Sequence, residues 1–91
     1  MAFAVRVKPN RMSKADYERV MRSLQEDGHG NPEGRREHQV LGDDEVVETF
    51  EVWDTHEQFR AHNDRFVTAM QAAGVDADLV TEEAPVPEEL D

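Results

Sequence analysis

The sequence predicts a small α+β domain of ferredoxin-like βαββαβ order, with a four-stranded antiparallel sheet and both helices on one face. Three patterns predict it: alternating apolar residues mark strands, apolar residues three and four positions apart mark two helices, and turns rich in glycine and proline separate them. The chain has 91 residues, which suits one domain. We expect a single domain over residues 1–84 and an acidic, proline-rich tail over residues 85–91.

The first half of the chain predicts a strand, a helix and a second strand. Residues 3–7 alternate apolar and polar side chains, which is typical of a strand. Ser13 supplies an N-cap side chain, and Asp16 stands where the acid of a capping box would stand. A loop over residues 27–34 separates this helix from a strand over residues 35–41. The apolar stripe of the helix is Tyr17, Val20, Met21 and Leu24.

The second half predicts a strand, a helix and a short last strand. Residues 46–53 form the clearest strand and follow a Gly-Asp turn, so they complete a hairpin. Thr55 and Gln58 form a capping box at the start of the second helix. Residues 78–81 are expected to be the last strand, and the tail is expected to lie as an arm across a dimer edge. The stripe of the second helix is Phe59, His62, Phe66, Ala69, Met70 and Ala73.

The second strand of the hairpin presents two alternating sets of side chains. We expect Phe50 and Val52 to face the helices, so that Val47, Thr49 and Trp53 lie on the open face of the sheet. Burying a large aromatic side chain contributes about 2–3 kcal/mol. The sequence therefore predicts a homodimer formed through the open sheet face.

Composition excludes several classes of partner and site. The net charge of -11 repels phosphate backbones and anionic membranes, so we expect neither nucleic acid nor membrane as a partner. The chain has no cysteine, which excludes disulfides and thiolate metal sites. No stretch approaches the roughly 18 apolar residues of a membrane span. We expect a cytoplasmic protein.

The run over residues 50–66 carries a resemblance to a known family. Trp53 ends a strand, and Phe59, His62 and Phe66 follow it on the next helix. This order resembles the strand-to-helix signature of the antibiotic-biosynthesis-monooxygenase-like, dimeric α+β barrel superfamily. The resemblance extends over residues 3–82 and implies a dimeric α+β barrel. The superfamily includes cofactor-free oxygenases, haem-degrading enzymes and isomerases.

Trp53 is the most informative residue of this resemblance. In the quinone-forming oxygenase branch, a pocket Trp is accompanied by an Asn four positions earlier and a Tyr six positions later. Here Thr49 and Phe59 stand at those positions. Phe cannot donate a hydrogen bond to a phenolate, and Thr orients a ligand less well than Asn. Trp53 is therefore interpreted either as the wall of a pocket or as packing in the dimer core.

The candidate pocket combines histidines, arginines and aromatic residues. His62 and His38 are the candidate catalytic acid/base residues, because an imidazole titrates near pH 6.5, about the middle of the physiological range. The alternative is that His62 is a buried core residue and that His38 and the arginines face solvent. An arginine beside His38 would favour an anionic or phenolic ligand. The candidate ligand-pocket residues are Arg6, Arg36, His38, Thr49, Trp53, Phe59 and His62.

We expect neither a metal nor a cofactor. His56 and His62 are six positions apart, so they lie on different helix faces and cannot share a metal ion. His56 is expected at the surface, and His29 lies in a glycine-rich loop that could act as a lid.

The leading functional hypothesis is a small-molecule pocket protein that acts on an aromatic or anionic ligand, as a cofactor-free oxygenase or a related enzyme. His62 or His38 would remove a proton from the ligand, and the resulting carbanion would react with oxygen. The alternative is a non-catalytic dimeric structural, regulatory or ligand-binding domain. A cavity that contains several candidate residues would favour the first, and a sheet face filled by a partner's side chains would favour the second.

Overall fold

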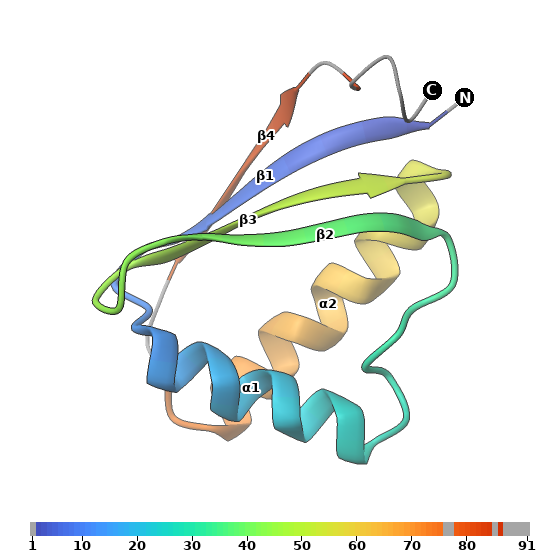
Figure 1. Cartoon of the computed structure of the whole chain (residues 1–91). Helices are drawn as coiled ribbons and strands as arrows, with labels where there is room; N and C mark the ends of the chain where they lie inside the picture. The colour runs from blue at the N-terminus through green and yellow to red at the C-terminus, as the bar shows by residue number, and fades with distance from the viewer. Residues whose placement is uncertain (1, 76–77, 85, 87–91) are drawn as a thin grey trace.

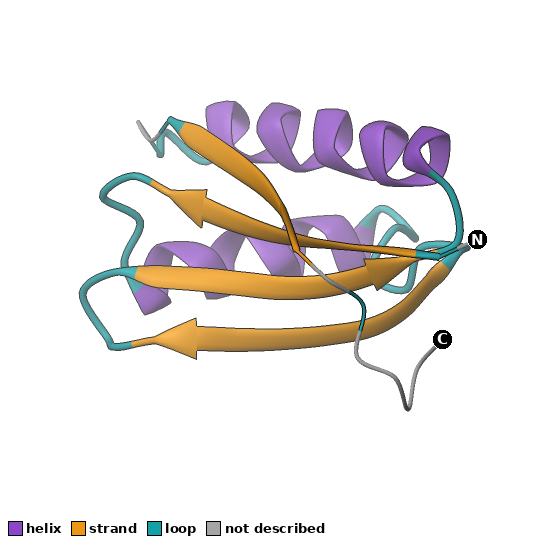
Figure 2. Cartoon of the chain, turned by 90° about the horizontal axis from the view of Figure 1, so that it is seen from above, coloured by secondary structure: helices purple, strands orange, loops and turns teal. Residues whose placement is uncertain are grey.

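The computed structural model describes residues 2–75, 78–84 and 86. The strands of its single sheet run in the order β2-β3-β1-β4, and all neighbours are antiparallel. Both helices lie on one face of this sheet (Figure 1; Figure 2). The predicted ferredoxin-like α+β fold is therefore confirmed. The elements are β1 (Phe3–Pro9), α1 (Lys14–Glu26), β2 (Arg35–Gly42), β3 (Val47–Trp53), α2 (His56–Ala72) and β4 (Leu79–Ala84).

β3 turns the set of side chains that includes Trp53 toward the helices. Val47, Thr49, Glu51 and Trp53 are all buried. The indole ring of Trp53 contacts the ring of Phe59 on α2, with the two ring centroids 5.8 Å apart. The prediction that Trp53, Thr49 and Val47 lie on the open face is therefore wrong.

A buried carboxylate explains the error. Hydrophobicity alone favours burial of the set that contains Phe50 and Val52, because the other set contains Glu51, a residue type that is rarely buried. In the structure Glu51 is only 5% exposed. Its carboxylate accepts hydrogen bonds from Thr49 Oγ1 (2.8 Å) and Trp53 Nε1 (2.9 Å), which compensate for lost hydration. Alternation along β3 then places Phe50 and Val52 on the face away from the helices, where Phe50 is partly exposed and Val52 is fully buried (0% exposed).

β2 contains a β-bulge at Arg36. The register places Arg35 opposite Trp53 and His38 opposite Glu51. Arg35 and His38 therefore share the helix-facing side although they are three positions apart, because the bulge inserts one extra residue between them.

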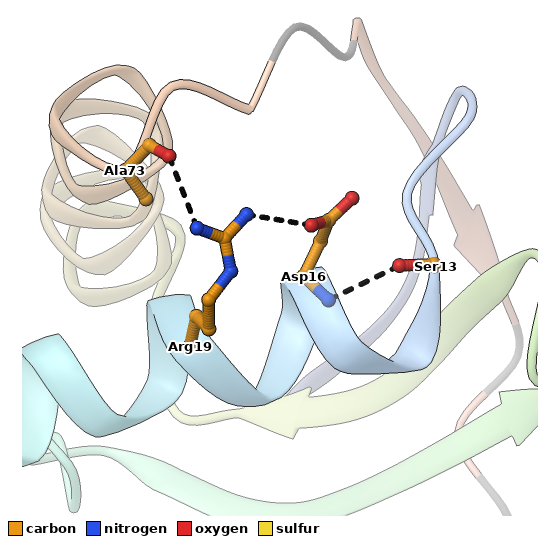
Figure 3. Close-up of polar contacts among 4 residues, drawn as sticks. All are labelled: Ser13, Asp16, Arg19 and Ala73. Atoms are coloured by element: carbon orange, nitrogen blue, oxygen red, sulfur yellow. Dashed lines mark hydrogen bonds and ion pairs between the residues drawn. The ribbon is translucent and has the colours of Figure 1, made fainter.

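The start of α1 is capped and is tied to the end of α2 (Figure 3). Ser13 Oγ accepts a hydrogen bond of 3.1 Å from the backbone N–H of Asp16, as the capping pattern predicts. The carboxylate of Asp16 pairs with Arg19 at 2.6 Å. Arg19 also donates to the carbonyl oxygen of Ala73 at 3.4 Å, so one side chain links the two helices.

The interior divides into two hydrophobic clusters. We call the larger one the apolar core: it joins the two helices and β3, and its buried members are Met12, Tyr17, Val20, Leu24, Val47, Phe66, Ala69, Met70 and Val75. We call the smaller one the Trp53 cluster, which consists of Val5, Val7, Trp53 and Phe59.

Two further predictions concern the ends of the chain and membranes. The acidic tail over residues 85–91, and the arm that it was expected to form, lie outside the described residues apart from Val86. Within the described part of the chain, neither helix is long and apolar enough to span a bilayer.

Candidate functional site

A cavity of about 10 Å³ lies between the helices and the sheet, which is about the space that one water molecule needs. Apolar side chains such as Val7, Met21, Phe59 and Phe66 form part of its wall. Apolar walls with a few converging polar groups are typical of a small-molecule site, although such sites usually enclose about 300–1,000 Å³. The polar residues that line it are Tyr17, Arg35, His38, Thr49, Glu51, His62 and Asn63.

Glu51 is the acidic group of this cavity. Residues two positions apart on a strand project from the same face, so Thr49 and Trp53 flank Glu51 on the helix-facing side. Each donates a hydrogen bond to its carboxylate. The acid is thus held in one orientation by its own strand, which is a rigid support for a site.

His62 approaches the cavity from α2. Its side chain is 5% exposed, and its ring centroid lies 5.3 Å from that of Trp53. The pKa of His62 is lowered from 6.5 to about 4, mainly by burial; the charge of Glu51 opposes this shift, and the positive charge of Arg35 adds to it. His62 is therefore a neutral imidazole near pH 7.

Tyr17 and His38 form a hydrogen-bonded pair across the two layers. Tyr17 of α1 and His38 of β2 meet at 2.9 Å between the phenol oxygen and Nε2. Burial raises the pKa of the Tyr17 phenol, and the charge of Glu51 raises it further. Burial also lowers the pKa of His38, as does the charge of Arg35. Both members of the pair are neutral near pH 7.

Arg35 supplies the positive charge of the cavity. It is the first residue of β2, and its Nη2 donates to the carbonyl oxygen of Gly30 at 3.3 Å. This bond ties the side chain to the loop before β2. The other terminal nitrogen, Nη1, is buried and has no hydrogen-bond partner among the described residues.

The structure brings some of the predicted pocket residues together and separates others. Trp53 lies behind the cavity wall, in contact with Phe59 and His62. Arg6 is exposed and lies on the opposite face of the sheet. Arg36 is also exposed, and it pairs with Asp54. The predicted residues that line the cavity are His38, Thr49, Phe59 and His62.

Four polar residues that line the cavity were missed by sequence reasoning: Glu51, Tyr17, Arg35 and Asn63. Glu51 could have been found from the pattern Thr-x-Glu-x-Trp, which places two hydrogen-bond donors beside one acceptor on the same strand face. Tyr17 is part of an apolar helical stripe, which gives no sign of its phenol oxygen's partner. Arg35 enters the cavity only because of the bulge at Arg36, which regular alternation does not predict.

The remaining histidines lie outside the cavity. His56 is exposed, stacks on Phe3 with ring centroids 3.8 Å apart, and pairs with Glu83 at 2.6 Å. His29 lies in the loop between α1 and β2. Among residues 2–75, 78–84 and 86, no three His, Asp or Glu side chains converge in a way that could hold a metal ion.

Comparison with known proteins gives the fold. No family model matches the sequence, and no curated protein matches it. A candidate antibiotic biosynthesis monooxygenase from Caulobacter crescentus is 20% identical, with a TM-score of 0.65 over 96% of this chain and 91% of the other. SnoaB, a cofactor-independent oxygenase from Streptomyces nogalater, is 17% identical, with a TM-score of 0.58 over 96% of this chain and 92% of its own.

These likenesses establish the architecture of antibiotic-biosynthesis-monooxygenase-like proteins for this chain, as the sequence resemblance implied. A de novo designed protein, Foldit4, has the same architecture at 9% identity, with a TM-score of 0.60 over 96% of this chain and all (100%) of its own. One backbone arrangement therefore accommodates very different sequences. The chemistry of this chain has to be argued from its own cavity.

Proposed function

We propose that the chain binds a small aromatic or anionic molecule in the cavity between its helices and its sheet, and acts on it as a cofactor-independent oxygenase or a related enzyme. The observation that carries this proposal is the convergence of seven polar side chains, from α1, β2, β3 and α2, on one buried space. Such a concentration of buried polar groups is costly to stability and is typical of functional sites. SnoaB, a cofactor-independent oxygenase with 17% identity, has the same fold.

In this reaction class a base removes a proton from an electron-rich aromatic substrate, and the carbanion reacts with molecular oxygen. One oxygen atom then enters the product and the other leaves as water. His62 is the preferred base, because it is neutral near pH 7 and its Nδ1 has no partner among the described residues. Glu51 stabilises the imidazolium that forms, since its charge raises the pKa of His62. His38, which is paired with Tyr17, is the second candidate.

Ligand binding can be measured without a label, because Trp53 is the only tryptophan of the chain and lies behind the cavity. A panel of monocyclic and polycyclic phenols should change its fluorescence, and a turned-over member should consume oxygen. His62→Gln should lower oxygen consumption by about 100-fold or more. His56→Gln, which replaces an exposed histidine of the same helix, is the matched control and should leave the rate unchanged. If no member of the panel affects Trp53, the proposal is wrong.

We also propose a homodimer formed through the open sheet face. The large apolar residues on that face are Phe50, Val52, Leu41 and Val80, not Trp53 and Val47. Leu41 is 40% exposed on the edge strand β2, and Val80 is 54% exposed on the opposite edge strand β4. Burial of these side chains would favour association. Light scattering should give twice the chain mass of 10.4 kDa. A Leu41→Glu, Val80→Glu double variant should be monomeric, and a monomeric parent protein at all concentrations would contradict the proposal.

The alternative is a non-catalytic dimeric structural or regulatory domain. One observation favours it: the cavity of about 10 Å³ is smaller than an aromatic ring, so side chains such as Met21 must move before such a ligand can enter. Met is flexible enough to do so. A protein that dimerises but binds no member of the phenol panel would support the alternative.

A further inference from the structure

The open face of the sheet, which points away from the helices (Figure 1), is covered at one end. Ala4 on β1 and Val52 on β3 pair with each other, and both are fully buried (0% exposed). Both face away from the helices, because Trp53, the residue after Val52, packs against α2. Arg6 and Val80 lie on the same face and are exposed. The helices therefore cannot provide the cover over Ala4 and Val52.

The strands beside Ala4 and Val52 do not explain this burial. On β4 the neighbour of Ala4 is Ala84, and on β2 the neighbour of Val52 is Glu37. Side chains stand roughly perpendicular to a sheet, and an alanine side chain ends at Cβ, so Ala84 cannot reach over the next strand. Glu37 is itself half-buried, which places it under the same cover. A further segment above this end of the sheet would account for the burial of all these side chains.

The chain that leaves β4 starts at this end of the face. β4 ends at Ala84, whose partner in the sheet is Ala4. Val86 follows two residues later and is half-buried, although it lies beyond the last strand. Residues 85–91 span at most about 25 Å when fully extended, whereas neighbouring strands lie about 5 Å apart. The segment is therefore long enough to pass over β1 and reach β3.

The composition of this segment suits an extended path over the face. Its two prolines favour an extended backbone and lack an N–H group, so the segment needs few backbone partners. Val86 and Leu90 are its large apolar side chains, and its other three residues are acidic. Arg6 lies two positions from Ala4 on the same face, is exposed, and offers the opposite charge. Apolar contact and opposite charge therefore both favour docking of the segment at this end.

We propose that residues 85–91 pack over the open face of their own chain, with Val86 above Ala4 and Val52. The occupant of this surface is thus the chain's own C-terminal segment and not a neighbouring subunit. A partner copy can then reach only the other end of the face, where Leu41 and Val80 are exposed. The segment limits the area over which the chain associates with itself, and this inference does not depend on the chemistry of the cavity.

The test measures which methyl groups solvent can reach. A neutral gadolinium chelate in solution broadens the NMR signals of exposed methyl groups and spares those of buried ones. The full chain carrying Leu41→Glu and Val80→Glu is used, so that no partner copy shields the face. The methyl signals of Val52 should be broadened as little as those of Val20, which is 0% exposed, and far less than those of Val40, which is 47% exposed.

Substitutions of Val86 assign the cover to the segment. Val86→Asp removes the apolar anchor and places a charge in its position, so the broadening of the Val52 signals should rise toward the level of Val40. Val86→Ser, which brings no charge, should change the broadening in the same direction by less. Val46→Asp is the matched control, because it changes an exposed valine (52% exposed) in the turn before β3 and should leave Val52 protected.

A second measurement locates the partner copy on the unsubstituted protein. Isotope-filtered NOE spectra of a mixture of labelled and unlabelled chains report only contacts between copies. Such contacts should reach the methyl groups of Leu41 and Val80, and none should reach Val52.

Three results would overturn the inference. If Val52 stays protected in a folded Val86→Asp variant, the side chains of the strands cover it. If Val52 is broadened like Val40 before Val86 is changed, its own chain does not cover it. An NOE between Val52 of one copy and any residue of the other copy means that a partner occupies this end of the face. A monomeric parent protein contradicts the homodimer proposed above but leaves the protection of Val52, and hence this inference, intact.

Discussion

The apolar core and the cavity lie under the same sheet but are built in opposite ways. In the apolar core, Met12 and Val20 are fully buried (0% exposed) and make only apolar contacts as side chains. In the cavity, Glu51 and His62 are each 5% exposed although both carry polar groups. Burial of apolar surface stabilises a fold, whereas burial of polar groups stabilises it only when each is hydrogen-bonded.

The residues of the apolar core stabilise the fold, whereas the buried polar residues of the cavity lower its stability. Apart from Tyr17 and Phe66, which also line the cavity, the apolar core consists of side chains that pack only among other core residues. Two buried polar atoms of residues that line the cavity, Arg35 Nη1 and His62 Nδ1, have no protein partner among the described residues. The effects of substitutions on the free energy of unfolding should therefore differ between the two regions, both in magnitude and in their dependence on pH.

The largest effect is expected for the aromatic residues of α2. Phe66→Ala in the apolar core and Phe59→Ala in the Trp53 cluster should each lower the free energy of unfolding by about 3–5 kcal/mol, because each leaves a cavity among buried side chains. Denaturant titration followed by circular dichroism measures the loss. Gln71→Ala, on the exposed side of the same helix, should change it by less than about 0.5 kcal/mol. A loss below about 1 kcal/mol at Phe66 would mean that the apolar stripe is not the buried face of α2.

The second prediction concerns low pH, which should destabilise the protein through protonation of His62 in the cavity. The pKa of His62 is 6.5 in the unfolded chain and about 4 in the folded protein, so the unfolded chain binds more protons between these values. The stability that depends on neutral His62 is therefore fully present above about pH 6.5 and is lost as the pH falls toward 4. The loss amounts to at most about 3 kcal/mol.

The measurement is a series of unfolding curves between these pH values. His62→Gln should flatten the dependence on pH, although His38, whose pKa is also lowered, keeps part of it. His56→Gln should reproduce the parent curve, since that residue is exposed. A parent protein whose stability does not change over this range would contradict the burial of neutral His62.

A smaller effect is expected at the carboxylate. Glu51→Leu removes the acceptor of two hydrogen bonds and leaves the donors of Thr49 and Trp53 unpaired, which should cost about 1–3 kcal/mol. Glu51→Gln keeps one acceptor and should cost less. Glu48→Gln, on the same strand but the opposite face, should stay within about 0.5 kcal/mol of the parent protein. If Glu51→Leu stabilises the protein, the two hydrogen bonds to the carboxylate do not contribute to stability in solution.

The smallest effect is expected on the open face of the sheet, which provides the baseline for both regions. Lys8 and Glu82 pair at 3.2 Å, with side chains that are 40% and 63% exposed. Lys8→Ala should lower the free energy of unfolding by less than about 1 kcal/mol, and added salt should reduce the difference further. A larger loss would mean that this pair is shielded from solvent by a partner.

Periodicity was sufficient to predict the secondary structure and the main body of the core. The stripe of α1 and its Ser13 cap follow from the spacing of apolar residues and from the first turn of the helix, and both are confirmed. The residues of the α2 stripe that form the core, such as Phe66 and Met70, were predicted in the same way. These features depend on contacts within one element, which a sequence reveals directly.

The cavity could be predicted only in part, because its residues break these patterns. Glu51 made the buried face of β3 look polar, so the face of Trp53 was assigned wrongly. The partner of Tyr17 lies 21 residues away on another element, and no local pattern reveals it. Arg35 faces inward only because one residue of β2 is left out of the regular ladder. Hydrogen bonds between elements and bulges are properties of the folded chain, and hydrophobicity does not encode them.

The bulge in β2 has a consequence for how the cavity could change in evolution. Two arginines stand side by side at this point, and the bulge decides which one faces the helices. Without the bulge, regular alternation would turn Arg36 inward with His38 and leave Arg35 on the other face. An arginine would enter the cavity in either case. Because the two arginines are adjacent, a shift of one residue in the register of β2 still leaves an arginine facing the helices. A lineage could therefore gain or lose the bulge without losing the positive charge of the cavity.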